Sequence, residues 1–247
     1  IVDGYFATDE EAANNGVVQS VVNYIINNAV VDRCLHAGDM KYLDLDGNNK
    51  IEQTVSANDI KDQRIIGNSL PRYTYSIRLN AEWNGIDFSV FFQGVGKQDW
   101  YPSSDAFAFW GPYSSPAPSF IPKDFLADVW SVDNPDAYFP RPRGYIAWTD
   151  GRSLSSVNNR YLQSLAYCRL KNLTVGYTLP VKWLSKIHVQ KARLYFSGEN
   201  LLTLDRLDTD YIDPEAAAAG TNWKTGKTNA LSYPFSKTYS FGIEITF

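Results

Sequence analysis

Apolar and polar residues alternate along the last segment of the chain, residues 237–247, which reads KTYSFGIEITF. The residues on its apolar side are Tyr239, Phe241, Ile243, Ile245 and Phe247. Because successive side chains of a β-strand point to opposite faces, this run predicts a strand with one apolar face. A chain end ordinarily frays, so a terminal residue in register with that face predicts that Phe247 is buried, either in a protein core or in a lipid bilayer.

Four other segments follow the same period of two and are predicted strands. They are residues 72–83, 86–96, 161–178 and 191–199. The first two flank Asn84-Gly85, which predicts a tight hairpin because both turn positions of such a hairpin need positive φ. In the third segment the alternation slips between Arg169 and Lys171, which predicts a β-bulge.

The region before these strands, residues 1–71, has a different pattern. Apolar residues in 17–30 occur in pairs four positions apart, which predicts a short helix. An Asp-rich turn follows at residues 44–59. We therefore expect a loop region with a helix and a turn, separate from the strands.

Short and long connections between the predicted strands take turns. Asn84-Gly85 and residues 179–190 are short, whereas residues 97–160 and 200–236 are long. This alternation is typical of a transmembrane antiparallel β-barrel, whose periplasmic turns are short and whose extracellular loops are long. Counting back from a periplasmic C-terminus places both long loops, and residues 1–71, outside the cell.

One face of each predicted strand is expected to contact lipid. Representative lipid-facing residues are Tyr75, Ile77, Phe88, Val90, Phe241 and Ile243. Five strands cannot close a barrel, and an open sheet edge in lipid leaves backbone polar groups without partners. The remainder of the barrel must therefore come from elsewhere.

Composition narrows these alternatives only in part. The formal net charge of −4 argues against broad affinity for nucleic acid. Aromatic residues make up 15% of the chain and suit strands, sugar-stacking surfaces and membrane interfaces alike. Cys34 and Cys168 lie far apart and form no zinc or disulfide pattern. The chain has no initiator methionine or signal peptide, so we expect a processed or partial piece of a longer protein.

Seven stretches of the chain together form a recognisable series. They are GDMKYLDLDGNNKIE (38–52), IIGNSLPRYTYSIRLNAEWNGIDFSVFFQGV (65–95), VWSVDNPDAYFPRP (129–142), YLQSLAYCRLKNLTVGYTLP (161–180), KARLYFSGENLLT (191–203), DPE (213–215) and YPFSKTYSFGIEITF (233–247). In order and spacing they resemble the C-terminal portion of SusC/RagA-type TonB-dependent outer-membrane transporters, which import glycans or peptides in Bacteroidetes. Neither 17–30 nor much of 100–128 is covered.

The resemblance implies the C-terminal strands of a 22-stranded barrel with an N-terminal plug. It also implies a SusD-like surface lipoprotein as partner, and energy supplied by TonB through an N-terminal part that is missing from this sequence. The apolar residues of the terminal strand then form the signal that the barrel-assembly machinery recognises. An alternative from the composition is a secreted all-β carbohydrate-binding module.

The Asp-rich turn resembles the start of an EF-hand calcium loop. The candidate ligands are Asp44, Asp46, Asn48, Lys50 through its backbone carbonyl, and Asp59. Two positions depart from the motif, because Asn49 replaces its glycine and Val55 its glutamate. The alternative is a plain turn whose Asp and Asn side chains bind their own backbone.

Six aromatic residues crowd the predicted loop after the second strand. They are Trp100, Tyr101, Phe107, Phe109, Trp110 and Tyr113. Such rings can stack on a sugar or hold a peptide. They can equally pack against neighbouring loops or against the lipoprotein.

Catalysis has no support in the sequence, and we predict that the chain is not an enzyme. An acidic group at Asp208, Asp210, Asp213 and Glu215 has the composition of a glycosidase pair, but a solvated loop at the barrel rim is the simpler interpretation. The two histidines, His36 and His188, have no metal-ligand spacing, and no nucleophile or phosphate-binding motif occurs.

Overall fold

The computed structural model consists mostly of antiparallel β-sheet with short helices. It describes residues 1–19, 25–26, 29–30, 35–52, 56–103, 106–113, 123–142, 154, 157–185, 188–209, 212–220, 227–228 and 233–247. The chain divides into two compact units. Unit 1 comprises Ile1–Asn68, Trp100–Gln163 and Gly220–Leu231, and unit 2 comprises Ser69–Asp99, Ser164–Ala219 and Ser232–Phe247.

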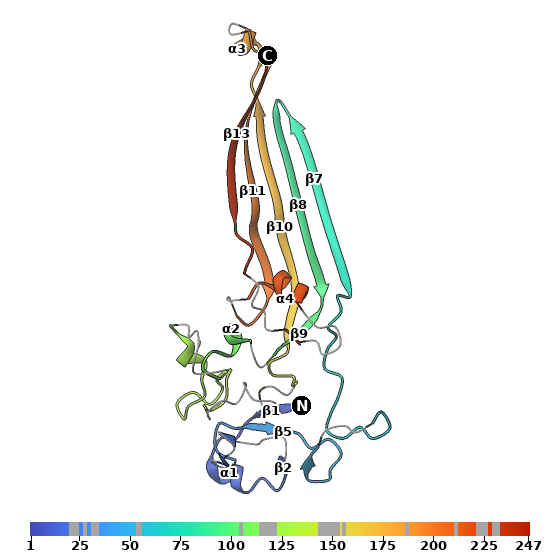
Figure 1. Ribbon diagram of the computed structural model, residues 1–247, viewed down its shortest axis with the longest axis vertical. Helices are drawn as coiled ribbons and strands as arrows, with labels where there is room; N and C mark the ends of the chain where they lie inside the picture. The colour runs from blue at the N-terminus through green and yellow to red at the C-terminus, as the bar shows by residue number, and fades with distance from the viewer. Residues whose placement is uncertain are drawn as a thin grey trace. The chain divides into compact units, whose positions relative to one another are not determined.

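Unit 2 is built on five long strands (Figure 1). They are β7 (Tyr73–Trp83), β8 (Ile86–Lys97), β10 (Gln163–Thr178), β11 (Lys191–Arg206) and β13 (Thr238–Thr246). Their order is β7-β8-β10-β11-β13, and every neighbouring pair is antiparallel. The fourth strand continues beyond residue 199 to Arg206, because Leu202 and Leu204 resume the alternation after Asn200.

The predicted hairpin and bulge are both confirmed. Asn84 and Gly85 have φ values of 50° and 83°, and they join β7 to β8 with Trp83 opposite Ile86. The ladders on both sides of β10 shift register between Leu170 and Asn172. Asn200 on β11 has a φ of 51°, so the partner strand bends at the same place.

The register gives the sheet one apolar and one polar face, because directly paired residues of antiparallel strands share a side. One apolar row consists of Ala81, Phe88, Val175, Phe196 and Phe241. The adjacent polar row consists of Asn80, Ser89, Thr174, Ser197 and Ser240. The alternation seen in single segments therefore extends across the whole sheet.

The short connections of unit 2 gather at one end of the sheet. The N–H of Thr178 donates to the carbonyl of Gly85 at 2.7 Å, and the N–H of Gln190 donates to the carbonyl of Thr246 at 2.9 Å. Helix α3 (Val181–Leu184) lies at this end together with the C-terminus, whereas α4 (Pro214–Gly220) lies at the other end of the strands (Figure 1). Among the described residues, no helix has the length and apolar content needed to span a membrane.

Unit 1 consists of short elements. The strands are β1 (Val2–Tyr5), β2 (Val18–Gln19), β3 (Ile25–Ile26), β4 (Ala29–Val30), β5 (Met40–Tyr42), β6 (Lys50–Ile51), β9 (Asp99–Pro102) and β12 (Lys227–Thr228). The helical segments are α1 (Asp9–Ala13), α2 (Phe107–Trp110) and the 3-10 helices η1 (Gly111–Tyr113) and η2 (Phe125–Asp128). β1 pairs with β5, β2 with β6, β3 with β4, and β9 with β12.

The helix predicted over residues 17–30 is wrong wherever the structure describes that stretch. β2, β3 and β4 occupy its described parts, and β3 pairs antiparallel with β4, with Ile25 opposite Val30. The segment is rich in Val and Ile, whose branched side chains lose rotamer freedom in a helix and favour strands. Residues 20–24 and 27–28 lie outside the described part of the chain.

Candidate functional site

The aromatic group of the predicted substrate loop lies in the core of unit 1. Trp100, Tyr101, Phe109, Trp110 and Tyr113 are buried, and Phe107 is half-buried. The Phe109 and Trp110 rings pack edge to face with centroids 4.8 Å apart. Trp110 also packs against Tyr161 at 5.2 Å, and Phe139 stacks on Tyr161 at 5.8 Å.

Polar contacts hold the same rings in place. The hydroxyl of Tyr101 donates to the carbonyl of Leu154 at 2.8 Å and accepts from Nδ2 of Asn158 at the same distance. Nε1 of Trp110 donates to the carbonyl of Ser103 at 2.8 Å. Burial raises the pKa of the Tyr101 hydroxyl well above its ordinary value. These rings fill a core, so the geometry supports packing within the loop region rather than stacking of these five rings on a ligand.

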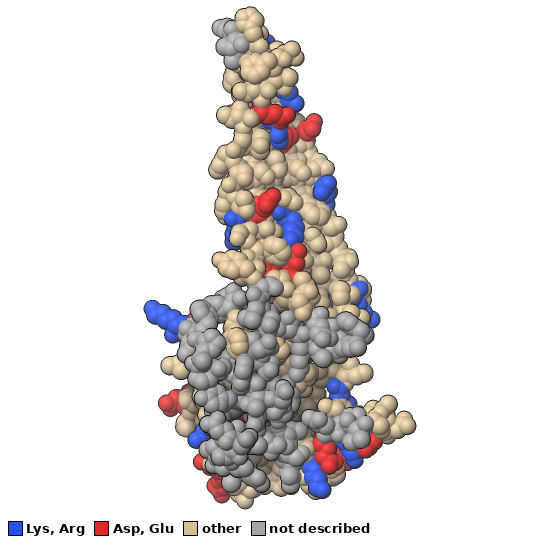
Figure 2. Space-filling model, in the orientation of Figure 1, with Lys and Arg blue, Asp and Glu red and all other residues tan. Residues whose placement is uncertain are grey.

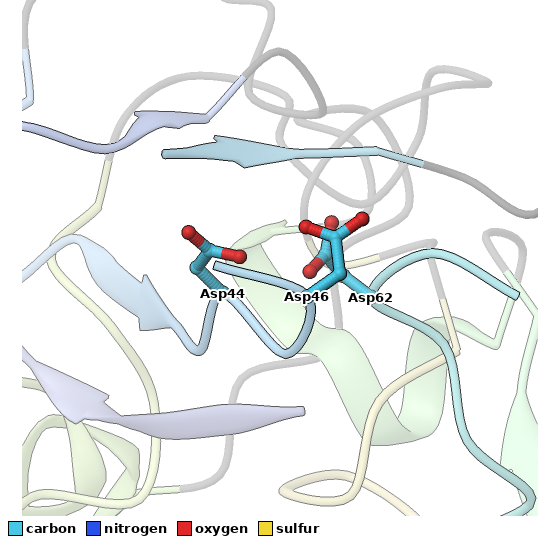
Figure 3. Close-up of side chains that lie close together, drawn as sticks. All are labelled: Asp44, Asp46 and Asp62. Carbon is cyan, nitrogen blue, oxygen red and sulfur yellow. The ribbon is translucent and has the colours of Figure 1, made fainter. Parts of the chain in front are cut away.

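Three carboxylates come together beside the Asp-rich turn of unit 1. Asp44 and Asp46 come from the turn itself and Asp62 from the chain that follows it, as Figure 3 shows, and each offers an oxygen within 4.8 Å of the others. Asp62 is buried and accepts the N–H groups of Leu45 and Glu52 at 2.8 and 2.7 Å. It therefore closes the loop from its inner side.

The carboxylate that joins the cluster differs from the predicted one. Asp59 lies 3.3 Å from Nζ of Lys61 and is not part of the group. The side chain of Asn48 accepts the N–H of Lys50 at 2.8 Å, which is an Asx turn. The sequence does not favour Asp62 over Asp59, because both stand beyond position twelve of a calcium loop.

Backbone donors shape the electrostatics of this turn. Asp44 accepts the N–H groups of Gly47 and Asn49, each at 2.7 Å. Burial acts to raise the pKa of Asp44, but the donors led by Asn49 and Gly47 outweigh it and hold this pKa below its ordinary value. Asn49 has a φ of 61°, so it takes the left-handed conformation expected of the missing glycine. The turn is thus ordered by its own side chains.

The apolar face of unit 2 is open rather than covered. The exposed large apolar residues on it include Tyr75, Ile77, Leu79, Trp83, Phe88, Val175, Leu194, Phe241 and Ile243. Phe241 is 83% exposed and the terminal Phe247 80%. Val90 is the exception among the six representative lipid-facing residues, since it is only 6% exposed between the neighbouring strands.

Comparison with known proteins finds relatives among TonB-dependent receptors. TonB-dependent receptor P3 of Formosa agariphila is 32% identical over 212 residues, which cover 83% of this chain and 19% of the receptor. TonB-dependent receptor P26 of the same organism is 27% identical over 189 residues, which cover 75% and 18%. The chain thus spans about a fifth of the length of these relatives. No protein-family model matches it.

Solved structures show the same fold. The RagAB peptide importer in its "open-open" state superposes with a TM-score of 0.53 at 23% identity, covering 83% of this chain and 20% of the matched chain. Its "closed-closed" state gives the same TM-score over 78% of this chain. The chain belongs to the TonB-dependent receptor family.

The polar face of the sheet in this TonB-dependent receptor carries paired charges. Over the strands, blue and red side chains lie next to each other on the face that Figure 2 shows. Arg193 binds Asp87 through two hydrogen bonds, Nε to Oδ1 at 2.8 Å and Nη2 to Oδ2 at 2.5 Å. Gly176 lies beside this pair, and a Cβ there would come within 2.3 Å of Asp87 Oδ1.

Part of the acidic group after β11 is held in ion pairs rather than solvated. Asp213 and Glu215 form ion pairs with Arg169 on β10, whose side chain is 1% exposed. Asp208 is exposed, and Asp210 lies outside the described residues. The interpretation as a solvated rim loop is therefore wrong for Asp213 and Glu215. The sequence offered one signal, the two cations Arg169 and Lys171 in an otherwise alternating strand.

Proposed function

We propose that this chain is part of the barrel wall of a TonB-dependent nutrient importer in the bacterial outer membrane. The observation that carries the proposal is the open apolar face of unit 2, opposite a face of Ser, Thr, Asn and paired charges. In water such an exposed apolar face promotes aggregation. In a bilayer it contacts lipid, while the polar face lines the inside of the barrel. The family relationship supports the same conclusion.

The rest of the barrel is supplied by the longer protein. Among the described residues, β7 and β13 each pair with one neighbouring strand only. A strand edge in lipid needs a partner for its backbone groups, so we propose that both edges continue into further strands of a barrel of 22 strands around a plug. The terminal strand, with its exposed apolar residues, serves as the barrel-assembly signal.

We further propose an orientation with the C-terminus in the periplasm. The two short connections and the end of β13 share one end of the sheet, which suits the periplasmic side. The long segments 97–160 and 200–236, and residues 1–71, then lie outside the cell. There they meet a SusD-like lipoprotein, while TonB acts on the part of the protein that precedes this chain.

The substrate class is a glycan or a peptide. RagAB, which shares the fold, is named a peptide importer, and this supports a peptide only by analogy of fold. The buried aromatic group of unit 1 offers no stacking surface that favours a sugar. A closed carbohydrate-binding module is not supported, because it would cover the rings that unit 2 leaves open.

Spin labels test the membrane assignment. Single labels replace Tyr75, Ile77, Phe241 or Ile243 on the apolar face, with labels at Ser76, Ser89 and Ser240 as matched controls on the polar face. In the full-length receptor in lipid vesicles, we expect oxygen to relax the first set strongly and a water-soluble quencher to leave it unaffected. Equal response of both sets to the water-soluble quencher would contradict the proposal.

We also propose that the Asp-rich turn binds calcium through Asp44, Asp46 and Asp62, with Asn48 and the carbonyl of Lys50 as further oxygen ligands. Calcium takes six to eight oxygens, and a carboxylate oxygen that accepts one N–H keeps a further lone pair. In terbium luminescence titrations, Asp62→Asn should abolish binding and Asp59→Asn should leave it unchanged. Equal titration curves for the wild type and Asp62→Asn would contradict this calcium site and favour the alternative, a turn whose Asp and Asn side chains bind only its own backbone.

A further inference from the structure

Arg169 is a buried cation on the polar face of β10. The register places it in one row with Ser76, Gln93 and Thr203. Its Nε donates to Oγ1 of Thr203 at 2.9 Å, which ties it to the neighbouring strand β11. The other two guanidinium nitrogens, Nη1 and Nη2, contact the segment of residues 212–219.

Both carboxylates of the DPE stretch bind this guanidinium. Nη2 donates to Oδ2 of Asp213 at 2.5 Å, and Nη1 donates to Oε2 of Glu215 at 2.8 Å. Lys171 donates to the other oxygen of Glu215 at 2.8 Å. Two cations on the strand thus face two anions on the following segment, and the cluster is electrically neutral.

Asp213 does two things at once. Its Oδ1 accepts the N–H groups of Glu215 and Ala216 at 3.0 and 3.1 Å, which caps the first turn of α4, while its Oδ2 accepts from Arg169. The start of α4 and its attachment to β10 therefore depend on one side chain.

An aromatic ring covers the cluster. The Phe235 ring centroid lies 5.0 Å from Cζ of Arg169 and 4.5 Å from Nζ of Lys171. Tyr167 lies on β10 beside the guanidinium, at 5.6 Å. Rings that stack on cations keep water away from them, so the ion pairs are stronger than exposed ones.

The apolar contacts of α4 contribute less to this attachment than its charges do. The buried side chains of α4 are Pro214, Ala216 and Ala217, which are small. Burial energy scales with the apolar area removed from water, so these residues supply little of it. Ile212, which precedes the helix, is the one large apolar side chain of residues 212–219 and is buried. Charge and hydrogen bonding hold the helix itself on the strand.

We propose that Arg169, with Lys171, Asp213 and Glu215, forms a latch that holds residues 212–219 over the polar face of the sheet. The proposal rests on the proposed function, in which that face lines the passage through the barrel. The latched segment then narrows the passage beside β10, and Arg169 is a positioning residue for it. Release of the latch leaves α4 free to move away from the strand.

Hydrogen exchange of the full-length receptor in detergent micelles tests the latch itself. In Arg169→Met, which keeps only the aliphatic part of the side chain, amide exchange at residues 215–217 should become at least about tenfold faster, because charged hydrogen bonds are lost. Arg169→Lys retains the positive charge but loses the planar, forked guanidinium that binds two carboxylates. Its exchange rate should lie between those of the wild type and Arg169→Met. Arg193→Met is the matched control, since it breaks a bidentate pair between strands and should leave amide exchange at residues 215–217 unchanged.

Equal amide exchange at residues 215–217 in the wild type and Arg169→Met would overturn the latch. So would the same acceleration in Arg193→Met, because the effect would then be a general loss of stability. If Arg169→Met does not fold, Glu215→Gln replaces it, with an expected acceleration that is smaller but still confined to this segment.

Thiol labelling on intact cells separates the latch from the proposed function. In a background of Cys34→Ser and Cys168→Ser, Ala217→Cys is expected to resist a membrane-impermeant maleimide, since Ala217 is buried, and to react at least about tenfold faster with Arg169→Met. Val132→Cys, on an exposed site, reports on the outer surface. If the exchange contrast holds but neither thiol is ever labelled from outside, the latch stands and the proposed orientation fails.

Discussion

The two units use aromatic side chains in opposite ways. In unit 1, Trp110 and its neighbours are sealed among other rings, and short helices and turns surround them. In unit 2, Phe241 and other rings stand open on one face of a regular sheet. The same residue types therefore form a packed core in one unit and an uncovered surface in the other.

This difference teaches that aromatic content alone does not identify a ligand site. A ring is available to a ligand or a lipid only where the backbone pattern leaves it without neighbours. Strict alternation does so in unit 2, because one side of every strand is committed to the same face. The irregular backbone of unit 1 instead turns its rings toward each other.

The largest expected effect comes from removing a sealed ring. Trp110→Ala should lower the free energy of unfolding of unit 1 by about 3–5 kcal/mol, because the vacated volume is only partly refilled. Hydrogen exchange across residues 100–113 measures this. Phe241→Ala is the control, since an open ring leaves no cavity, and exchange in 100–113 should not change. Equal losses of protection across residues 100–113 in the two variants would contradict the proposed difference between sealed and open rings.

A smaller effect comes from crowding a ring through a glycine. A Cβ on Gly38 would lie 2.5 Å from Cδ2 of Trp130, and the φ of +82° at this position strains any L-residue. Gly38→Ala should cost about 2–4 kcal/mol, from backbone strain and overpacking together. A Cβ on Gly94 in unit 2 would lie 2.2 Å from the backbone carbonyl oxygen of Tyr167 and 2.5 Å from Cζ of Tyr75, although the φ of Gly94 is not in the left-handed region.

Gly94→Ala should cost a similar amount, about 2–4 kcal/mol, because the carbonyl oxygen of a paired strand cannot move aside as a side chain can. Denaturant titration followed by tryptophan fluorescence measures the first variant, and exchange of the β8 amides measures the second. A larger loss for Gly94→Ala than for Gly38→Ala would show that the sheet, and not the loop region, is the more tightly packed unit.

The smallest effect is a pH dependence confined to unit 1. The pKa of Asp44 is depressed in the folded state by the N–H donors of Asn49 and Gly47, against the opposing effect of burial. Its contribution to stability is therefore complete above the unfolded pKa of about 3.9 and is lost as pH falls through the folded value. The amide NMR shifts of residues 47 and 49 should titrate below pH 4. Asp44→Asn should remove that step, and its persistence would assign the step to another group.

The regular parts of the fold were readable from the sequence because local pattern decides them. The hairpin at Asn84-Gly85 and the bulge near Lys171 each leave a local signature. The extension of β11 past Asn200 was missed, because an Asn at a strand bend resembles a strand end. The segment 17–30 was misread, since paired Val and Ile fit a helical spacing and a strand preference equally well.

The candidate sites were less predictable, because their members are far apart in sequence. Asp62 completes the carboxylate cluster only after the chain returns past the turn, and Asp59 and Asp62 both lie beyond a calcium motif of fixed spacing, so the spacing does not choose between them. Asp213 and Arg169 are 44 residues apart, and their pairing depends on how the segment after β11 folds back. No periodicity links such residues.

By itself, the sequence determined the strands, their two unlike faces and the tight turn, since each depends on side-chain alternation and local backbone preference. Only the tertiary structure decided which aromatic rings are sealed and which are open, and which charges find a partner. Those outcomes depend on contacts between distant segments, and the free energy of such contacts is set by packing and burial rather than by any local pattern.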